Sequence, residues 1–306
     1  MEKDWVKEIN KLKKERKAVV LAHYYTLPEV QEIADCLGDS LALAQYAEKT
    51  DADMIVFAGV HFMAETAKIL NPDKKVLIPD FHSRCSLADT CPAEDFAEFK
   101  REHPDHKVIS YINCSAAIKV MSDVICTSGN AEKIVGSFGK DEPLIFAPDE
   151  NLGSYLNRKL GREMLLWNGG CHVHFQLDEE DLMDARKKYP DAVFIAHPEC
   201  RESLLRHASF IGSTTALIKY VKNSNEKNFI IATEEGILHE MKKEVKDKEL
   251  FILKKKNLPN YGCAYMKLNN LEKIYACLKD GVNEIVMDKE TMDKARKPIL
   301  KMLSLS

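Results

Sequence analysis

The chain has 306 residues, enough for one large domain or for two to three compact ones. Hydrophobic residues make up 45% of it and charged residues 30%, a globular composition that excludes wholesale disorder. The 44 basic and 48 acidic residues give a formal net charge of −4, and both signs are interspersed along the chain. We therefore expect no nucleic-acid partner, because such a partner requires a basic surface.

The N-terminal residues show a charged, amphipathic pattern that predicts a helix over 5–16. This pattern differs from the apolar core of a signal peptide, and no apolar run approaches the roughly 18 residues of a membrane span. We therefore expect a cytoplasmic protein with no membrane partner. Nine cysteines, an odd number without an export signal, argue against a disulfide framework and leave metal binding, catalysis or burial.

A pattern of helix, short β-branched strand and polar residue occurs three times along the chain. The three expected strands cover residues 18–25, 107–113 and 192–199. Each strand carries near its end a polar residue that is able to do chemistry: His23, Asn113 and His197. The repetition predicts three structural units of similar design.

Each copy continues in the same way. A hydroxyl residue stands before a helical run and is expected to cap that helix: Ser40, Ser128 and Ser213. A second strand, another helix and a third strand follow, and a few residues beyond the third strand stands a cysteine: Cys85, Cys171 and Cys263. Successive cysteines of this set are 86 and 92 residues apart, close to the period of the other repeated features.

Strands that alternate with helices predict an α/β fold of three similar small domains, each with a parallel sheet. Functional groups of such sheets collect beyond the carboxyl ends of the strands. We therefore expect the domains to surround a pseudo-threefold axis with the active site at the centre. The expected domains cover 1–88, 89–175 and 176–267. Segment 268–306 is expected to pack back onto the first domain, with a simple C-terminal extension as the alternative.

Three equivalent cysteines would bring three thiolates to this axis. Three thiolates without a fourth fit a [4Fe–4S] cluster with one open iron, or an incomplete zinc site. The sequence contains no CxxC pair, which structural zinc normally uses, so the cluster is favoured. Its open iron would be a Lewis acid that promotes loss of water from a substrate. The remaining cysteines are expected to be buried small side chains: Cys36, Cys91, Cys114, Cys126, Cys200 and Cys277.

The expected surroundings of the cluster suit an anionic substrate. Helix N-termini at Ser40, at Ser128 and at Ser213 and Thr214 would present backbone N–H groups to the centre. Three histidines would add donors that become cationic near neutral pH: His23, His174 and His197.

Motifs spread over nearly the whole chain resemble, in order, those of the quinolinate synthase family. They include HYY (23–25), GDSLALA (38–44), YINCS (111–115), CTSGNA (126–131), CHVH (171–174), HPEC (197–200), GSTTAL (212–217) and CAYMK (263–267). The resemblance implies three α/β domains and a [4Fe–4S] cluster held by Cys85, Cys171 and Cys263. It implies condensation of iminoaspartate with dihydroxyacetone phosphate to quinolinate, with release of phosphate and water, for NAD biosynthesis. An aspartate oxidase or dehydrogenase that makes iminoaspartate is the implied functional partner.

The resemblance also implies roles for individual residues. His23 and Ser40 match positions that hold a carboxylate of the iminoaspartate part, and Tyr111 and Asn113 match positions over the reacting carbon skeleton. The remaining implied substrate-binding positions are Tyr25, Ser128, His174, His197, Glu199, Ser213 and Thr214. Imine formation, tautomerisation and dehydration all require proton transfers, for which Glu199 is the first choice, Tyr111 the second and His23 the third.

Two other functions stay open at this point. An aconitase-type hydro-lyase would use the open iron on a small hydroxy acid without building a ring or releasing phosphate. A non-enzymatic iron–sulfur sensor would need a partner surface, whereas a set of inward-facing His, Ser, Tyr and Glu residues favours a closed pocket.

Overall fold

The strands form three separate four-stranded sheets in this computed structural model, which describes residues 4–256, 258 and 261–306. The first sheet consists of β1 (Ala18–His23), β2 (Cys36–Gly38), β3 (Met54–Ala58) and β4 (Lys75–Leu77). The second consists of β5 (Lys107–Tyr111), β6 (Val124–Cys126), β7 (Leu144–Ala147) and β8 (Leu165–Leu166). The third consists of β9 (Val193–Ala196), β10 (Phe210–Ile211), β11 (Asn228–Ala232) and β12 (Glu249–Ile252).

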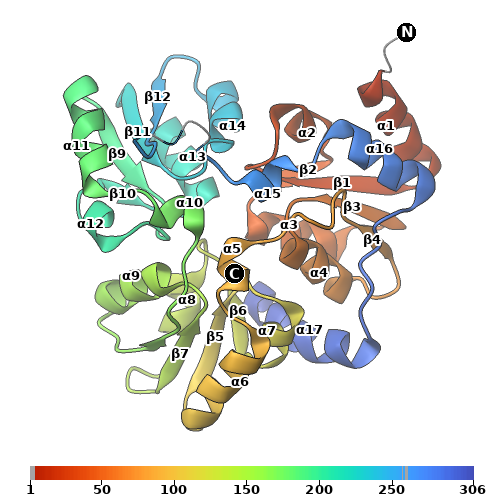
Figure 1. The fold of residues 1–306 in the computed structure, drawn as a ribbon, viewed down its shortest axis with the longest axis horizontal. Coiled ribbons are helices and arrows are strands. Elements are labelled where there is room, and N and C mark those ends of the chain that lie inside the picture. Colours follow the sequence, from red (N-terminus) through yellow and green to blue (C-terminus); the bar gives the residue numbers. More distant parts are fainter. Residues whose placement is uncertain (1–3, 257, 259–260) are drawn as a thin grey trace.

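All neighbouring strands within these sheets are parallel, and the strand order is the same in each: β2-β1-β3-β4, β6-β5-β7-β8 and β10-β9-β11-β12. Figure 1 shows the three sheets in three lobes around a common centre. The predicted α/β fold with three similar parallel-sheet units is therefore confirmed.

The shared strand order explains where the functional residues lie. The chain leaves β1, β5 and β9 first toward one side of the sheet and later toward the other. Such a reversal opens a crevice beyond the carboxyl end of the inner strand. His23 ends β1, Tyr111 ends β5, and His197 directly follows β9. Each sheet therefore brings a polar side chain to its own crevice.

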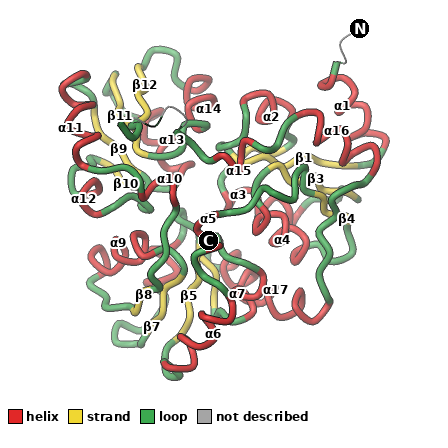
Figure 2. The backbone as a smooth tube through the Cα atoms, viewed as in Figure 1, coloured by secondary structure: helices red, strands yellow, loops and turns green. Residues whose placement is uncertain are grey.

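Helices cover both faces of the sheets and connect the lobes (Figure 2). The first lobe holds α1 (Trp5–Glu15), α2 (Pro28–Ile33), α3 (Ser40–Lys49) and α4 (His61–Leu70). The next helices are α5 (Ser86–Asp89), α6 (Ala93–Glu102), α7 (Ala116–Val120), α8 (Ala131–Gly136) and α9 (Glu150–Leu160). The third lobe holds α10 (His172–Phe175), α11 (Glu179–Lys188), α12 (Glu202–Leu205), α13 (Thr214–Asn223) and α14 (Ile237–Glu244). The chain ends with α15 (Ala264–Lys267), α16 (Leu271–Asp280) and α17 (Lys289–Ser304).

Three short strands, β2, β6 and β10, were not among the predicted elements. They have two or three residues each, too few for a periodic pattern, and they exist because they pair with the inner strand of their sheet. The hydroxyl residue that was expected to cap a helix follows the end of each short strand by two positions.

The capping prediction is wrong in two of the three copies. Asp39 caps α3, since its Oδ1 accepts the N–H of Ala42 at 3.1 Å, and Ser40 is the first residue of that helix. Ser128 lies two residues before Asn130, which precedes α8. The third prediction is confirmed, because Ser213 Oγ accepts the N–H of Ala216 at 3.3 Å at the start of α13. Asp and Ser are about equally favoured as N-cap residues, so the sequence pattern alone does not decide which of two neighbours caps the helix.

The C-terminal segment joins two lobes. Helix α16 packs against α1 and β3, and a bridge between Leu77 and Glu284 extends the edge at β4. Helix α17 lies against α4, α7 and β6, and one continuous buried core spans the first and second sheets. The segment therefore contacts the second sheet as well as the first, which the sequence did not predict. The domain boundaries themselves stay a prediction.

The described helices include none that is both long and apolar enough to cross a bilayer.

Candidate active site

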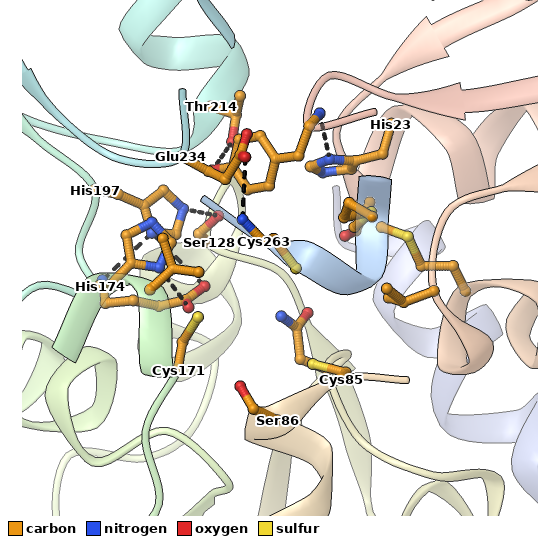
Figure 3. A pocket seen from close by; sticks show the side chains of 18 of the residues that line it. His23, Cys85, Ser86, Ser128, Cys171, His174, His197, Thr214, Glu234 and Cys263 are labelled. Carbon is orange, nitrogen blue, oxygen red and sulfur yellow. Dashed lines mark hydrogen bonds and ion pairs between the residues drawn. The ribbon is translucent and has the colours of Figure 1, made fainter. Parts of the chain in front are cut away.

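A cavity at the meeting point of the three lobes collects nearly all of the predicted site residues (Figure 3). Its lining includes His23, Tyr25, Ser40, Cys85, Tyr111, Asn113, Ser128, Cys171, His174, His197, Glu199, Thr214 and Cys263. Ser213 is not among the lining residues. Its Oγ accepts the N–H of Ala216 at the start of α13 and lies 3.5 Å from Asp39 Oδ2, so its hydroxyl is already engaged within the protein.

The three repeated cysteines share one local structure. Cys85, Cys171 and Cys263 each precede a four-residue helix, respectively α5, α10 and α15. Figure 3 shows their side chains pointing toward one another across the cavity. Three loops about one domain apart in the chain therefore present three sulfurs to one space.

The chemistry of these thiols fits a sulfur-bound metal centre. Burial raises the pKa of Cys85 to about 12 and that of Cys263 to about 11, and it raises the pKa of Cys171 well above its ordinary value. Neighbouring thiolates and Glu199 add to the rise of the pKa at Cys85 and Cys171, and Glu234 adds to it at Cys263, whereas backbone N–H groups at each helix start oppose it. Three thiolates are thus costly here unless a cation holds them, and binding one would release their protons.

A second group of potential metal ligands lies beside Cys171. Its sulfur, a nitrogen of His174 and an oxygen of Glu199 lie within 4.8 Å of one another. Both ring nitrogens of His174 and both oxygens of Glu199 already have hydrogen-bond partners in the protein. The set that keeps its ligand atoms turned to the cavity is the cysteine trio.

Glu199 is the centre of a hydrogen-bond network across lobes. Its side chain is 4% exposed, its Oε1 accepts the Tyr111 hydroxyl at 2.6 Å, and its Oε2 lies 3.1 Å from His174 Nδ1. Burial alone would raise the pKa of Glu199, but His174, His197 and the Tyr111 hydroxyl hold it below its ordinary value. Burial and the carboxylate raise the pKa of Tyr111 well above its ordinary value. The pair is therefore a carboxylate facing a protonated phenol.

The network continues to the first lobe through Thr233. His174 Nε2 lies 3.0 Å from Thr233 Oγ1, which lies 2.7 Å from the Tyr25 hydroxyl. That hydroxyl also lies 3.0 Å from Thr214 Oγ1 at the start of α13. Thr233 was not predicted as a site residue. It directly follows β11, at the carboxyl end of a central strand of the third sheet.

The histidines differ from their predicted charge state. Burial lowers the pKa of His23 to about 4 and that of His197 to about 3, and nearby carboxylates only partly oppose this shift. Both imidazoles are therefore neutral at pH 7, and the expectation of cationic donors was wrong for them, because neither is exposed to water. His197 Nε2 lies 3.2 Å from Ser128 Oγ, which links the third lobe to the second.

Asn113 brings a free acceptor to the cavity. Its side-chain Oδ1 is buried and has no hydrogen-bond partner among the described residues. Lys119, which is fully buried, donates to the carbonyls of Ile112 and Cys114 on either side of it. A buried ammonium group thus holds the turn that presents Asn113.

Several polar lining residues were not predicted from the sequence: Asp39, Arg84, Ser86, Thr127, His172 and Glu234. Most of them adjoin a predicted residue in the chain, so the signal was proximity to a motif. Glu234 is the exception. It lies two residues after the end of β11, and a search for polar residues just beyond each strand would have found it.

These features define a class of protein: an α/β enzyme with three parallel-sheet lobes and a buried, cysteine-lined central cavity. The family model described as quinolinate synthetase A protein matches residues 7–304. A quinolinate synthase of Trichodesmium erythraeum is 55% identical over 304 residues, covering 99% of this chain and 94% of that protein. One of Nostoc punctiforme is 56% identical over 299 residues, covering 97% of this chain and 92% of that protein.

The chain belongs to the quinolinate synthase family, as its motifs indicated. A third relative, the quinolinate synthase of Chloroherpeton thalassium, is 55% identical over 306 residues, 99% of this chain and 95% of its own. Membership of this family makes the protein an enzyme of NAD biosynthesis and decides against the hydro-lyase and the sensor.

Proposed function

We propose that this chain condenses iminoaspartate with dihydroxyacetone phosphate to form quinolinate, and that phosphate and water are released. The observation that carries the proposal is the composition of the cavity. The sulfurs of three cysteines line it together with Glu199, Tyr111 and uncharged hydroxyl, imidazole and amide side chains. The substrates are small anions, and the lining supplies hydroxyl, imidazole and amide groups that bind carboxylate and phosphate oxygens. The three sheets each contribute to this lining, so one chain encloses the site.

A [4Fe–4S] cluster ligated by Cys85, Cys171 and Cys263 is the proposed cofactor. The donor set of three sulfurs that line one cavity supports it, as does the electrostatic cost of thiolates without a cation. When bound, such a cluster supplies an iron with an open coordination position, a Lewis acid that favours departure of hydroxide. The protein's own residues supply binding and proton transfer.

Substrate binding is proposed to begin at the first and second lobes. His23 and Ser40 would hold a carboxylate of iminoaspartate, and Asn113 Oδ1 would accept a hydrogen bond from an N–H or O–H of the substrates. Thr214, Ser128 and His197 would donate to the remaining carboxylate or to phosphate. Tyr25 contacts Thr214 and Thr233, and it would close this side of the cavity.

Proton transfer is proposed to centre on Glu199. As a carboxylate it can remove a proton from a carbon or nitrogen of the substrate, and the Tyr111 hydroxyl at 2.6 Å can return one to a departing oxygen. His174 would keep the carboxylate in place through its bond to Oε2. His23, which is neutral, would act as a hydrogen-bonding group and as a secondary proton carrier.

The direct test is anaerobic purification with quantitation of iron and sulfide, followed by product analysis with both substrates. Quinolinate and phosphate should form together, and omission of either substrate should prevent both. Water loss from a hydroxy acid without phosphate release would contradict the proposal.

The ligand assignment is tested by single Cys→Ser variants. Substitution of Cys85, Cys171 or Cys263 should abolish the visible absorbance of the cluster. Cys277 is the matched control, because it is fully buried on the opposite side of the first sheet, where its Sγ donates to the Ile78 carbonyl. Equal loss of absorbance in all four variants would refute the assignment.

Three further predictions accompany this function. An aspartate oxidase or dehydrogenase would supply iminoaspartate, since an imine of this kind hydrolyses readily in water. A cytoplasmic location and the division into domains at residues 88 and 175 also remain predictions.

A further inference from the structure

Helix α15, which begins directly after Cys263, lies between the first and third lobes (Figure 1). Two charged side chains meet there. Glu234 follows β11 in the third lobe, and Lys267 ends α15. The Lys267 Nζ lies 3.1 Å from Glu234 Oε1, and the Glu234 side chain is 1% exposed. Neither residue has a part in the proposed reaction, so this pair, with its buried carboxylate, calls for an explanation.

The carboxylate of Glu234 accepts hydrogen bonds from the backbone on two sides, one of them from the loop that carries Cys263. Its Oε1 accepts the backbone N–H of Cys263 at 3.2 Å, and its Oε2 accepts that of Gly236 at 2.6 Å. Figure 3 shows the bond from Cys263 to Glu234 beside the cavity. A carboxylate that accepts two backbone N–H groups and a lysine has no unsatisfied oxygen left, which favours one fixed arrangement.

The ammonium group of Lys267 reaches the other way. Its Nζ donates to the backbone carbonyl of Tyr25 at 2.7 Å. Tyr25 belongs to the loop that follows His23, the last residue of β1, and the Tyr25 N–H in turn donates to His23 Nδ1 at 3.2 Å. Lys267 thus contacts two partners simultaneously. One is the Tyr25 carbonyl in the first lobe, and the other is Glu234, which accepts the N–H of Cys263.

Close backbone packing secures the same junction. A Cβ on Gly236 would lie 2.8 Å from the Tyr24 carbonyl oxygen and from Tyr25 Cα, so only glycine permits this approach. Gln31 is buried in the first lobe, and its Nε2 donates to the Gly236 carbonyl at 3.1 Å and to the Tyr24 carbonyl at 2.8 Å. The loop of the first lobe and the segment after β11 are therefore joined by close packing and by the hydrogen bonds of Gln31.

We propose that Glu234 and Lys267 are positioning residues that couple the His23–Tyr25 loop to the backbone of Cys263. A ligand that binds to His23 and Tyr25 then contacts the loop to which Lys267 is hydrogen-bonded. Through Lys267 and Glu234, this loop is connected to the backbone that orients the Cys263 sulfur. The inference rests on the proposed function, because it takes Cys263 to be a cluster ligand. It adds a link between substrate contact and cluster retention.

The test uses the anaerobically purified holoenzyme with Glu234→Gln and Lys267→Met. A glutamine has one acceptor oxygen where Glu234 uses two, and methionine removes the bond to Tyr25 and leaves the buried Glu234 with its two backbone donors but without the positive charge of Lys267. The first readout is the rate at which a chelator removes iron, followed by the visible absorbance of the cluster. We expect both variants to lose iron roughly 10-fold faster or more, since loss of groups that orient metal ligands costs 10–100-fold in affinity.

The second readout is KM against kcat for the two substrates. Coupling requires that Glu234→Gln, which does not touch Tyr25 directly, raise KM as well as speed iron loss. Lys267→Arg should restore both quantities toward the parent values, because arginine can donate to the same two oxygens. A variant that changes iron loss but leaves KM unchanged would overturn the coupling.

Lys273→Met is the matched control. Lys273 pairs with Asp80 at 2.6 Å and donates to the Leu268 carbonyl at 3.0 Å, so it makes the same kinds of bond in the next helix without contacting Tyr25 or Cys263. Its iron loss should stay within about twofold of the parent, as expected for a partly exposed pair. If the parent holds no cluster, the proposed function fails. If the parent holds the cluster and all variants release iron like Lys273→Met, only this inference fails.

Discussion

Replacing Glu199 by glutamine removes the proposed proton acceptor while nearly keeping its shape. The carboxylate accepts from Tyr111 at 2.6 Å and interacts with His174 Nδ1 at 3.1 Å. Glutamine has a single acceptor oxygen, so its amide N–H₂ must face one of these two groups. The three cysteines are unchanged, and the cluster should therefore be retained.

The size of the effect follows from the burial of the site. A positioned acid–base group contributes about 10²–10⁴-fold in rate, or about 2.7–5.4 kcal/mol at 1.36 kcal/mol per factor of ten. Because the Glu199 side chain is 4% exposed, bulk water is poorly placed to take over its role. We expect kcat to fall roughly 100-fold or more, because no other group replaces the general base.

The pH dependence of kcat gives a second test of the role of Glu199. His174, His197 and Tyr111 together hold the pKa of Glu199 below its ordinary value, against the effect of burial. The carboxylate therefore persists as the pH falls through the ordinary glutamate range. Its stabilising contribution is present above that range and is lost as the pH falls through the lowered pKa. The acid limb of kcat in the parent enzyme should lie below the usual glutamate range and should be absent in Glu199→Gln.

The assay measures quinolinate formation under anaerobic conditions, with cluster absorbance recorded on the same samples. Glu180→Gln is the control, since the Glu180 side chain is 76% exposed and pairs with Lys256 at 3.7 Å on the surface. Unchanged turnover in Glu199→Gln with an intact cluster would refute the assignment and would move the proton transfer to Tyr111 or His23.

Three other predictions concern different parts of the molecule. Lys119→Met should lower the free energy of unfolding in urea by about 1–3 kcal/mol, because it removes two hydrogen bonds of a fully buried side chain and takes away the donor of the Cys114 carbonyl, whereas the Ile112 carbonyl keeps the N–H of Cys114. Lys100→Met, which removes one hydrogen bond of a part-buried side chain, should cost less, and the reverse order would contradict the account. Burial and nearby Glu199 raise the pKa of Asp149 well above its ordinary value, so stability falls as pH rises from the ordinary aspartate range toward that raised pKa. Asp149→Asn should remove this slope in unfolding measured at several pH values, and a persistent slope would exclude Asp149 as its source. Air and a chelator together should abolish activity, because an iron with an open position is the most easily lost, and full activity after long exposure would count against a three-cysteine cluster.

The sequence determined the repeat and its chemistry. A strand that ends in a polar residue, followed by a cysteine after the third strand, is a local pattern, so His23, Cys85, Cys171 and Cys263 could be found by comparing the copies with one another. The parallel sheets followed from the alternation of strands and helices, because that order leaves few other ways to bury the strands.

Tertiary structure decided what depends on packing between lobes. The short strands form only by pairing with an inner strand, and the neutral state of His23 and His197 results from burial that several lobes create together. The bonds from Glu234 to Cys263 and from Lys267 to Tyr25 join residues 29 and 242 positions apart. No local pattern encodes such contacts, since they arise where separately folded segments meet.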